Sequence, residues 1–242
     1  MIKEEESTKD VGVTVNNKGT FTEHIDSTTK TCLKISGMIL RSFHSREKDI
    51  MLTLLKVLIL PRMDYCSVLW APFKVEEIRR VEKIQSNFTK HINIPGIKEM
   101  DYWTRLKTLN LYSVQRRFER YKIIYVWKIL QGLVVNPGIE FNDDLGSRTG
   151  LTCKIPKHTM NLREKSFMIS GPRLFNSLPK EIRECPLKSV QDSQVSVNHF
   201  KSKLDNFLKD IPDEPNLSGD YSKRMQGINN LGERTNSIIR IM

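Results

Sequence analysis

The stretch from residue 51 to residue 92 constrains the fold more than any other part of the chain. It begins with an apolar run, MLTLLKVLIL, and Pro61 follows at once. Because proline cannot continue a helix interior, this pattern predicts a buried helix that ends at Leu60. A short aromatic corner comes next and closes at Pro72. Its large side chains are expected to pack together: Tyr65, Trp70 and Phe73.

The segment after Pro72 predicts a second helix with one apolar face and one positive face. Its apolar residues recur at steps of three and four: Ile78, Val81, Ile84, Phe88 and Ile92. Its cations fall away from that stripe: Arg79, Arg80, Lys83 and Lys90. Such a face is typical either of a surface that binds a negatively charged partner or of a plain solvated surface.

Periodic apolar residues predict further helices over residues 22–43, 101–109, 113–130 and 197–211. Ser45 is expected to cap the helix that ends at Leu60. The helix 113–130 carries a second positive side, with Arg116, Arg117, Arg120 and Lys122. Alternation predicts a strand over 10–15, and short strands are expected at 151–155 and 166–170. We therefore expect a mainly α fold, with a short N-terminal strand and minor β structure in the C-terminal half.

The charge of the chain indicates which class of partner it could bind. The net charge is +11 and the isoelectric point is about 9.5. Between Arg79 and Lys128 there are 12 Lys or Arg residues against 4 Asp or Glu, so much of the excess lies on two helices and their connection. This clustering favours nucleic acid over an anionic membrane as the partner.

The remaining composition indicates a soluble intracellular chain. The four cysteines lie more than thirty residues apart, without a C-x-x-C pair, which argues against a zinc finger and against a disulfide scaffold. The N-terminus has no apolar core of the kind found in signal peptides. The longest apolar run, at 51–60, is too short to cross a bilayer.

No catalytic constellation stands out in the sequence. The five histidines are scattered, and there is no phosphate-binding glycine loop. The tetrapeptide FNDD at 141–144 resembles the aromatic-x-Asp-Asp box of polymerases, in which paired carboxylates hold Mg²⁺. Since no apolar strand flanks Asp143 and Asp144, an acidic loop is the preferred interpretation, and no metal or cofactor is expected.

Several short motifs follow one another in a fixed order along the chain. They are KDVGV at 9–13, FTEHI at 21–25, PRMDYCS at 61–67 with Trp70 and Pro72, the helix 78–92, RLK at 105–107, Arg116-Arg117, SF at 166–167, NSLP at 176–179 and FKSKLDNFL at 200–208. Together they resemble the C-terminal part of a reverse transcriptase from a non-LTR (LINE-type) retrotransposon. Two details depart from that family: Phe175 stands where its tryptophan precedes N-x-L-P, and T-R-G appears as RTG at 148–150.

The resemblance implies four regions. Residues 1–20 would be a ragged end with a remnant strand of the polymerase palm, and 21–132 a thumb-like helical bundle. Residues 133–211 would be a post-thumb region, and 212–242 a flexible tail. The catalytic aspartates of the fingers and palm are absent, so the chain is not expected to be an enzyme, and Mg²⁺ would be needed only by the missing palm.

Three hypotheses follow. In the first, the chain binds the backbone of an RNA–DNA or RNA duplex without sequence preference, through a set of cations: Arg79, Arg80, Lys83, Lys90, Arg116, Arg117 and Arg120. In the second, it is a helical protein–protein interaction module, or a remnant without function, and an exposed apolar patch at the aromatic corner would favour the module. In the third, Asp143 and Asp144 are metal ligands of an enzyme. The oligomeric state is left open.

Overall fold

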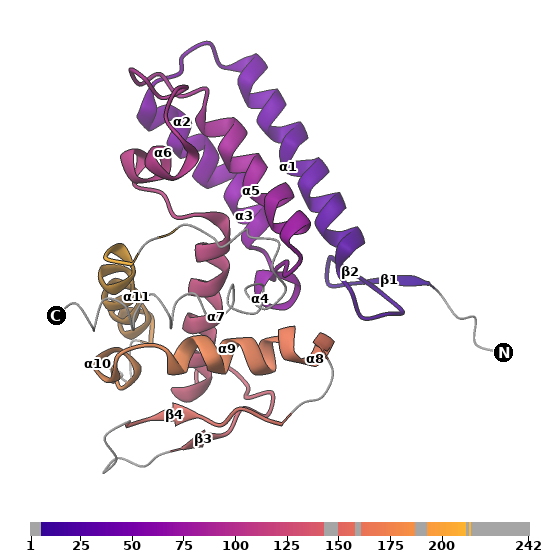
Figure 1. Cartoon of the computed structure of the whole chain (residues 1–242), viewed down its shortest axis with the longest axis vertical. Coiled ribbons are helices and arrows are strands. Elements are labelled where there is room, and N and C mark those ends of the chain that lie inside the picture. Colours follow the sequence, from indigo (N-terminus) through magenta and orange to yellow (C-terminus); the bar gives the residue numbers. More distant parts are fainter. Residues whose placement is uncertain (1–5, 143–149, 158–160, 187–192, 212, 214–242) are drawn as a thin grey trace. The chain divides into compact units, whose positions relative to one another are not determined.

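The computed structural model describes residues 6–142, 150–157, 161–186, 193–211 and 213. Within these residues the chain is mainly helical, with one short sheet near the N-terminus and another in the C-terminal half, which confirms the predicted fold class (Figure 1). The chain divides into two compact units, Met1–Phe118 and Glu119–Met242. The division falls within α7 (Val114–Leu130), whereas the sequence places a boundary at 132, after that helix ends.

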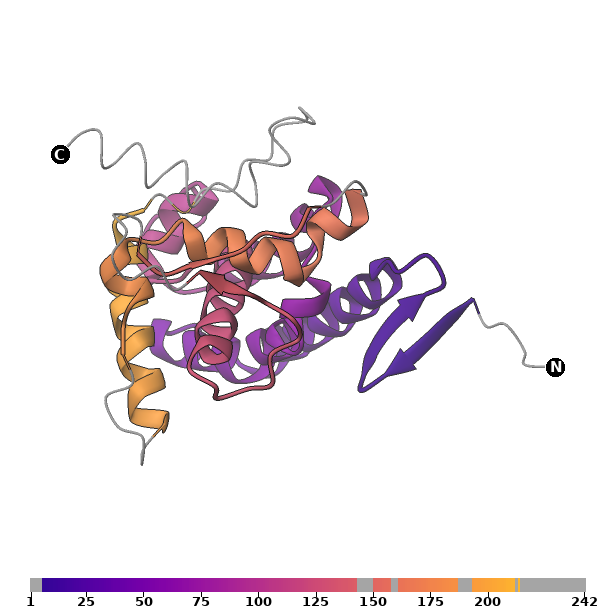
Figure 2. The ribbon, with the colours of Figure 1, turned by 90° about the horizontal axis from the view of Figure 1, so that it is seen from below.

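The first unit opens with a β-hairpin in place of the single strand predicted over 10–15. β1 (Ser7–Asp10) pairs antiparallel with β2 (Val13–Asn16) beside the N-terminal end of α1 (Thr22–Ser42) (Figure 2). The prediction was wrong because Val11 and Gly12 form the turn, with φ of 43° and 82°. Positive φ at both central residues is the geometry of a tight hairpin turn. The Tyr65 hydroxyl donates a hydrogen bond to the Val11 carbonyl at 2.9 Å, which anchors this turn.

The helices α1 and α5 (Val75–Thr89) pack side by side and carry much of the core of the first unit. Both helices place an apolar stripe inward, as their sequence period predicts. The buried side chains of the two stripes include Ile25, Cys32, Ile39, Ile84 and Phe88. Their opposite sides face solvent and are therefore available for contacts with a partner.

The apolar run after residue 48 does not end at Leu60. It forms α2 (Lys48–Leu54), a π-helical stretch η1 (Leu55–Ile59) and α3 (Leu60–Asp64). Pro61 lies at the second position of α3, directly after the wider π turn, in which the Leu60 N–H donates to the Leu55 carbonyl five residues earlier. The change of hydrogen-bond pattern at this turn accommodates a residue that has no N–H to donate. The predicted cap at Ser45 is also wrong, since α2 begins after Glu47, whose side chain makes no capping hydrogen bond.

The aromatic corner is built around one buried ring. Trp70, in α4 (Ser67–Trp70), is 1% exposed, and its indole N–H donates to the Tyr65 carbonyl at 2.7 Å. The ring meets His24 and Phe118 edge to face, with centroids 5.1 and 5.3 Å apart. Tyr65 itself remains half exposed and reaches the hairpin.

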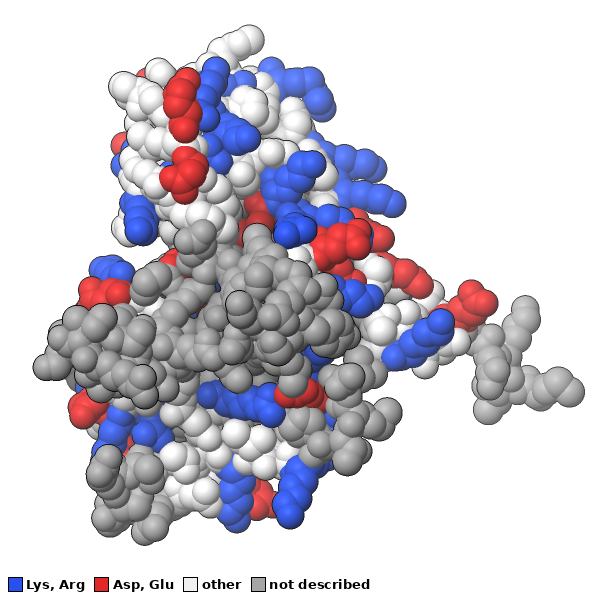
Figure 3. Space-filling view, viewed as in Figure 1, with Lys and Arg blue, Asp and Glu red and all other residues white. Residues whose placement is uncertain are grey.

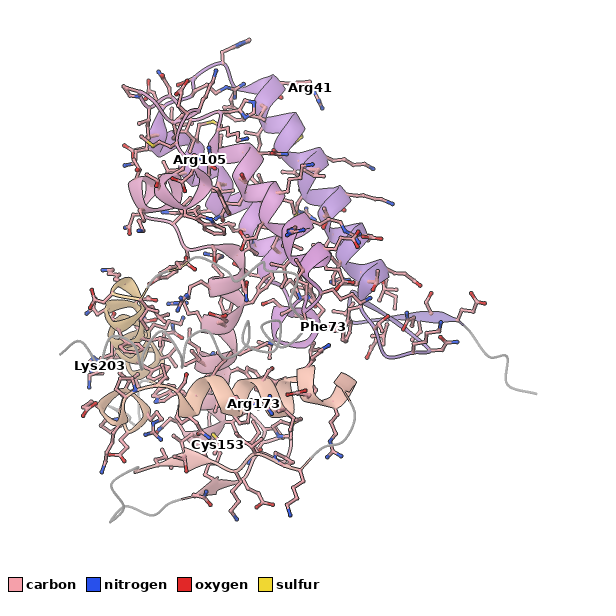
Figure 4. The ribbon with its side chains drawn as sticks, viewed as in Figure 1. Arg41, Phe73, Arg105, Cys153, Arg173 and Lys203 are labelled. Atoms are coloured by element: carbon pink, nitrogen blue, oxygen red, sulfur yellow. The ribbon has the colours of Figure 1, made fainter. Side chains whose placement is uncertain are left out.

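A buried arginine holds α6 (Tyr102–Leu109) against the end of α5. Arg105 is 1% exposed, and burial lowers the pKa of its guanidinium (Figure 4). It donates to the hydroxyls of Thr89 and Ser86 and to three backbone carbonyls, those of Ser86, Ile97 and Met100. These neutral acceptors tie the segment between α5 and α6 to both helices.

In the second unit, β3 (Phe141–Asn142) pairs with β4 (Thr152–Cys153), and α8 (Asn161–Lys165), α9 (Phe167–Asn176) and α10 (Lys180–Arg183) follow. The strand predicted at 166–170 is wrong, because these residues enter α9, which buries Phe167, Ile169 and Ser170. The Asn176 side chain accepts from the Cys153 N–H at 2.7 Å and donates to its carbonyl at 2.9 Å. It thereby satisfies the free edge of β4 as a strand would.

The core of the second unit forms where α11 (Ser193–Lys209) packs on α7. Trp127 stacks on Phe200, and its indole N–H donates to the Cys185 carbonyl at 3.0 Å. Lys122 lies in the same unit, 8% exposed, with its ammonium 3.1 Å from the hydroxyl of the buried Ser170. Burial lowers the pKa of Lys122 to about 8, and the nearby Glu119 opposes this shift.

Candidate nucleic-acid interface

The predicted phosphate-binding residues fall into two groups in the structure. Arg79 and Lys83 of α5 are exposed, and so is Lys90, directly after the last residue of this helix. Arg80 lies beside them but forms ion pairs with Asp26 of α1 and, at 3.1 Å, with Glu76 one turn earlier. It therefore fastens α5 to α1 rather than presenting a fully open charge to a ligand.

The arginines predicted on α7 do not form an exposed face. Arg116 is 1% exposed. Arg117 donates from Nε to Asp64 at 3.2 Å and makes a second contact with the same carboxylate through Nη2. Arg120 binds both oxygens of Asp205, at 2.6 and 2.8 Å. The side chains of Arg117 and Arg120 hold helices together, and that of Arg116 is buried, so all three fit a structural role better than contact with phosphate.

Sequence reasoning missed three cations that the structure places beside α5. Lys30, Lys34 and Arg41 are exposed along the outer face of α1, and Arg41 lies near its C-terminal end (Figure 4). The signal was present in the sequence, because these positions lie opposite the buried stripe of Cys32 and Ile39 on a helical wheel. We refer to six exposed cations as the basic seam: Lys30, Lys34, Arg41, Arg79, Lys83 and Lys90.

Contacts between α1 and α5 fix the geometry of the basic seam. The Thr22 hydroxyl donates to Glu77 at 2.9 Å, and Asp26 pairs with Arg80. Residue numbers thus rise together along the two helices, which run in the same direction. Beyond their C-terminal ends, the Asn93 N–H donates to the Arg46 carbonyl at 2.7 Å and joins the two following segments.

Each helix carries its cations with the same spacing. The steps are four and then seven residues, both in Lys30, Lys34 and Arg41 and in Arg79, Lys83 and Lys90. At a rise of 1.5 Å per residue, each row extends over about 16 Å. Since one strand of a duplex advances about 3.4 Å per phosphate along the axis, a row of this length matches about five phosphates.

Two of the three carboxylates of α5 do not reach this face, whereas Glu76 is exposed and pairs with Arg80. Glu77 and Glu82 are buried, 3% and 5% exposed. Glu77 accepts from Thr22, and Glu82 accepts from the Tyr102 hydroxyl at 2.7 Å and from the Gln115 N–H at 2.9 Å. The helix is therefore close to neutral in composition, while its outward charge is positive.

The sequence along the basic seam is free of acids beyond its beginning. No Asp or Glu occurs in residues 27–46 or 83–98. Figure 3 shows the result: Lys and Arg side chains line the α1 and α5 region, while acidic side chains gather near the N-terminal end of α1. A positive potential therefore extends along most of both helices.

The sequence also suggested two other candidate sites, the aromatic corner and the pair Asp143 and Asp144. At the aromatic corner Trp70 is buried while Tyr65 is 49% exposed, so only part of the aromatic patch that would favour a protein-interaction module reaches the surface. Asp143 and Asp144 lie outside the residues that the structure describes. Among the residues it does describe, no group of three or more His, Cys, Asp or Glu side chains comes together as a metal site requires.

Comparison with known protein families, with curated proteins and with solved structures gave no match. A search of the described helices found none with the length and apolar character needed to cross a bilayer.

Proposed function

We propose that this chain binds the phosphodiester backbone of nucleic acid through the basic seam, without preference for base sequence. The observation that carries the proposal is the pair of parallel helices whose exposed cations repeat with one spacing on one face. Lysine and arginine contacts to phosphate position a protein on nucleic acid but do not read its bases. An RNA–DNA or RNA duplex is the ligand that we favour.

We further propose that the chain derives from the thumb and post-thumb region of a non-LTR retrotransposon reverse transcriptase. This part rests on the ordered motifs of the sequence. The structure gives several of the motif residues packing roles: Trp70 closes the corner, Arg105 joins α5 to α6, and Asn176 completes β4. No catalytic role belongs to the proposal, because the polymerase aspartates are absent from the resemblance.

The test is binding of a fluorescently labelled RNA–DNA duplex, measured by anisotropy at several salt concentrations. Six phosphate contacts would give a slope of log K against log salt of about −4 to −5, since each contributes about 0.7 to 0.9. The seam variant, Lys34→Glu with Lys83→Glu, should weaken binding and make the slope shallower by about two.

A matched control removes the effect of net charge. Lys56→Glu with Lys107→Glu makes the same change at two exposed positions outside the basic seam. This control should bind nearly as the original chain does. Equal loss in both double variants would show that only total charge matters, and no binding at low salt would overturn the proposal.

A further inference from the structure

A second positive cluster lies in the second unit, where α7 and α11 pack against each other in opposite directions (Figure 1). The rings of Trp127 and Phe200 stack with centroids 4.5 Å apart and 7° between their planes. Arg120, two turns earlier on α7, binds both oxygens of Asp205, which lies later on α11. Residue numbers fall on one helix as they rise on the other, so the pair is antiparallel.

This register brings two lysines to the same side of the helix pair. Lys128 directly follows Trp127, and Lys201 directly follows Phe200. One residue turns a side chain by about 100° around its helix axis. In antiparallel helices that meet through the two aromatic rings, this turn carries both lysines to one side. Both are half-buried.

Electrostatics at Lys201 indicates that the cluster is short of negative charge. Burial lowers the pKa of Lys201, and the charges of Arg120 and Lys128 lower it further, while Asp205 opposes them. Both oxygens of Asp205 already accept from Arg120. Among the described groups that act on Lys201, cations thus outnumber carboxylates. Desolvation and neighbouring like charges both disfavour the charged form of a lysine, and a nearby anion favours it.

We propose that Lys128 and Lys201 bind a phosphate group between them, supported by the positive charge of Arg120. Two ammonium groups from opposite helices can each donate to a different oxygen of a tetrahedral anion, whereas a planar carboxylate offers only two. The site belongs to the second unit and the basic seam to the first, so this inference does not rest on the proposed function. The phosphate could be free, a terminal monoester or part of a nucleic-acid backbone.

The experiment titrates the full chain with inorganic phosphate at constant ionic strength and follows binding by isothermal titration calorimetry. Saturable binding is expected, and Lys128→Met and Lys201→Met should each weaken it at least fivefold. Lys201→Arg should restore most of the affinity, because it keeps the charge. Lys203→Met is the matched control: Lys203 is exposed on the same helix and should make no difference (Figure 4).

Two further titrations distinguish the sources of the phosphate, and both use the seam variant so that the basic seam contributes little. A short oligonucleotide with a 5′-phosphate should compete with inorganic phosphate if the site takes monoesters, and its unphosphorylated form should compete equally if the site takes a backbone diester. No saturable binding by any of the three probes would overturn the inference. Equal weakening by all three methionine variants would also overturn it, since that reflects bulk charge.

Discussion

The buried ammonium of Lys122 should make the second unit less stable at neutral pH than at high pH. The side chain is 8% exposed, and the partner shown for its ammonium is the neutral hydroxyl of Ser170, at 3.1 Å. Burial lowers its pKa from 10.5 to about 8. Lys122→Met removes the charge while retaining most of the length of the side chain, so it isolates this effect.

The expected magnitude follows from the pKa. A shift from 10.5 to about 8 corresponds to about 3 kcal/mol, at 1.36 kcal/mol per unit. Because the folded pKa is lowered, the unfolded chain binds more protons between about pH 8 and pH 10.5, and the free energy of unfolding rises with pH across that window. Below about pH 8 the full penalty applies. Loss of the hydrogen bond to Ser170 subtracts about 1 kcal/mol, so Lys122→Met should gain about 2 kcal/mol at pH 7.

Urea unfolding at pH 7 and at pH 10.5, followed by far-UV circular dichroism, measures this difference. Lys203→Met serves as the control, because an exposed lysine has the same charge without the burial. The advantage of Lys122→Met should disappear at pH 10.5 and turn into a loss of about 1 kcal/mol. A variant that is less stable than the original at pH 7, or a stability difference that does not change with pH, would refute the reasoning.

Three other changes test the packing. Arg105→Met should lower the free energy of unfolding by about 3 kcal/mol or more, because buried acceptors lose a charged donor; a loss below 1 kcal/mol in urea would contradict this. Val11→Asn should raise stability by about 0.5 to 1 kcal/mol, seen as a higher melting temperature, since asparagine tolerates the positive φ that strains valine. Asn176→Ala should cost about 2 kcal/mol through its two bonds to Cys153, whereas Asn142→Ala, at an exposed position in β3, should change little in the same urea titration.

The regular helices could be predicted from the sequence because their apolar residues repeat with the helical period. Asp101, which was expected to begin a helix, caps α6 by accepting from the Trp103 and Thr104 N–H groups. Gly132, two residues after the predicted end of the helix 113–130, adopts φ of 67° just after α7. The residues at a helix end determine where the helix begins or stops, so these ends can be predicted from the nearby sequence.

The sequence predictions that were wrong concern features that depend on contacts with residues distant in the chain. Pro61 ends a helix in most contexts, but here the π-helical stretch before it changes the turn, and no residue pattern announces that stretch. Arg117 and Arg120 look like surface cations from their own helix. Their partners, Asp64 and Asp205, lie 53 residues earlier and 85 residues later in the chain. Periodicity gives the face of a helix but not the neighbour that covers it.

The two rows of cations in the basic seam are displaced from each other along the helix axes, and this displacement affects how a polyanion could move along the surface. Asp26 and Arg80, which face each other, are 54 residues apart, whereas the matched cations of the two rows are 49 apart. One row is therefore displaced from the other by about five residues, or about 7 Å along the helix axes. This displacement brings Lys30 level with Lys83 and Lys34 close to the level of Lys90, so the middle of the basic seam carries two cations at each level and its ends carry one. A polyanion on this surface would therefore be attracted most strongly at the middle of the basic seam, which would favour one register over sliding.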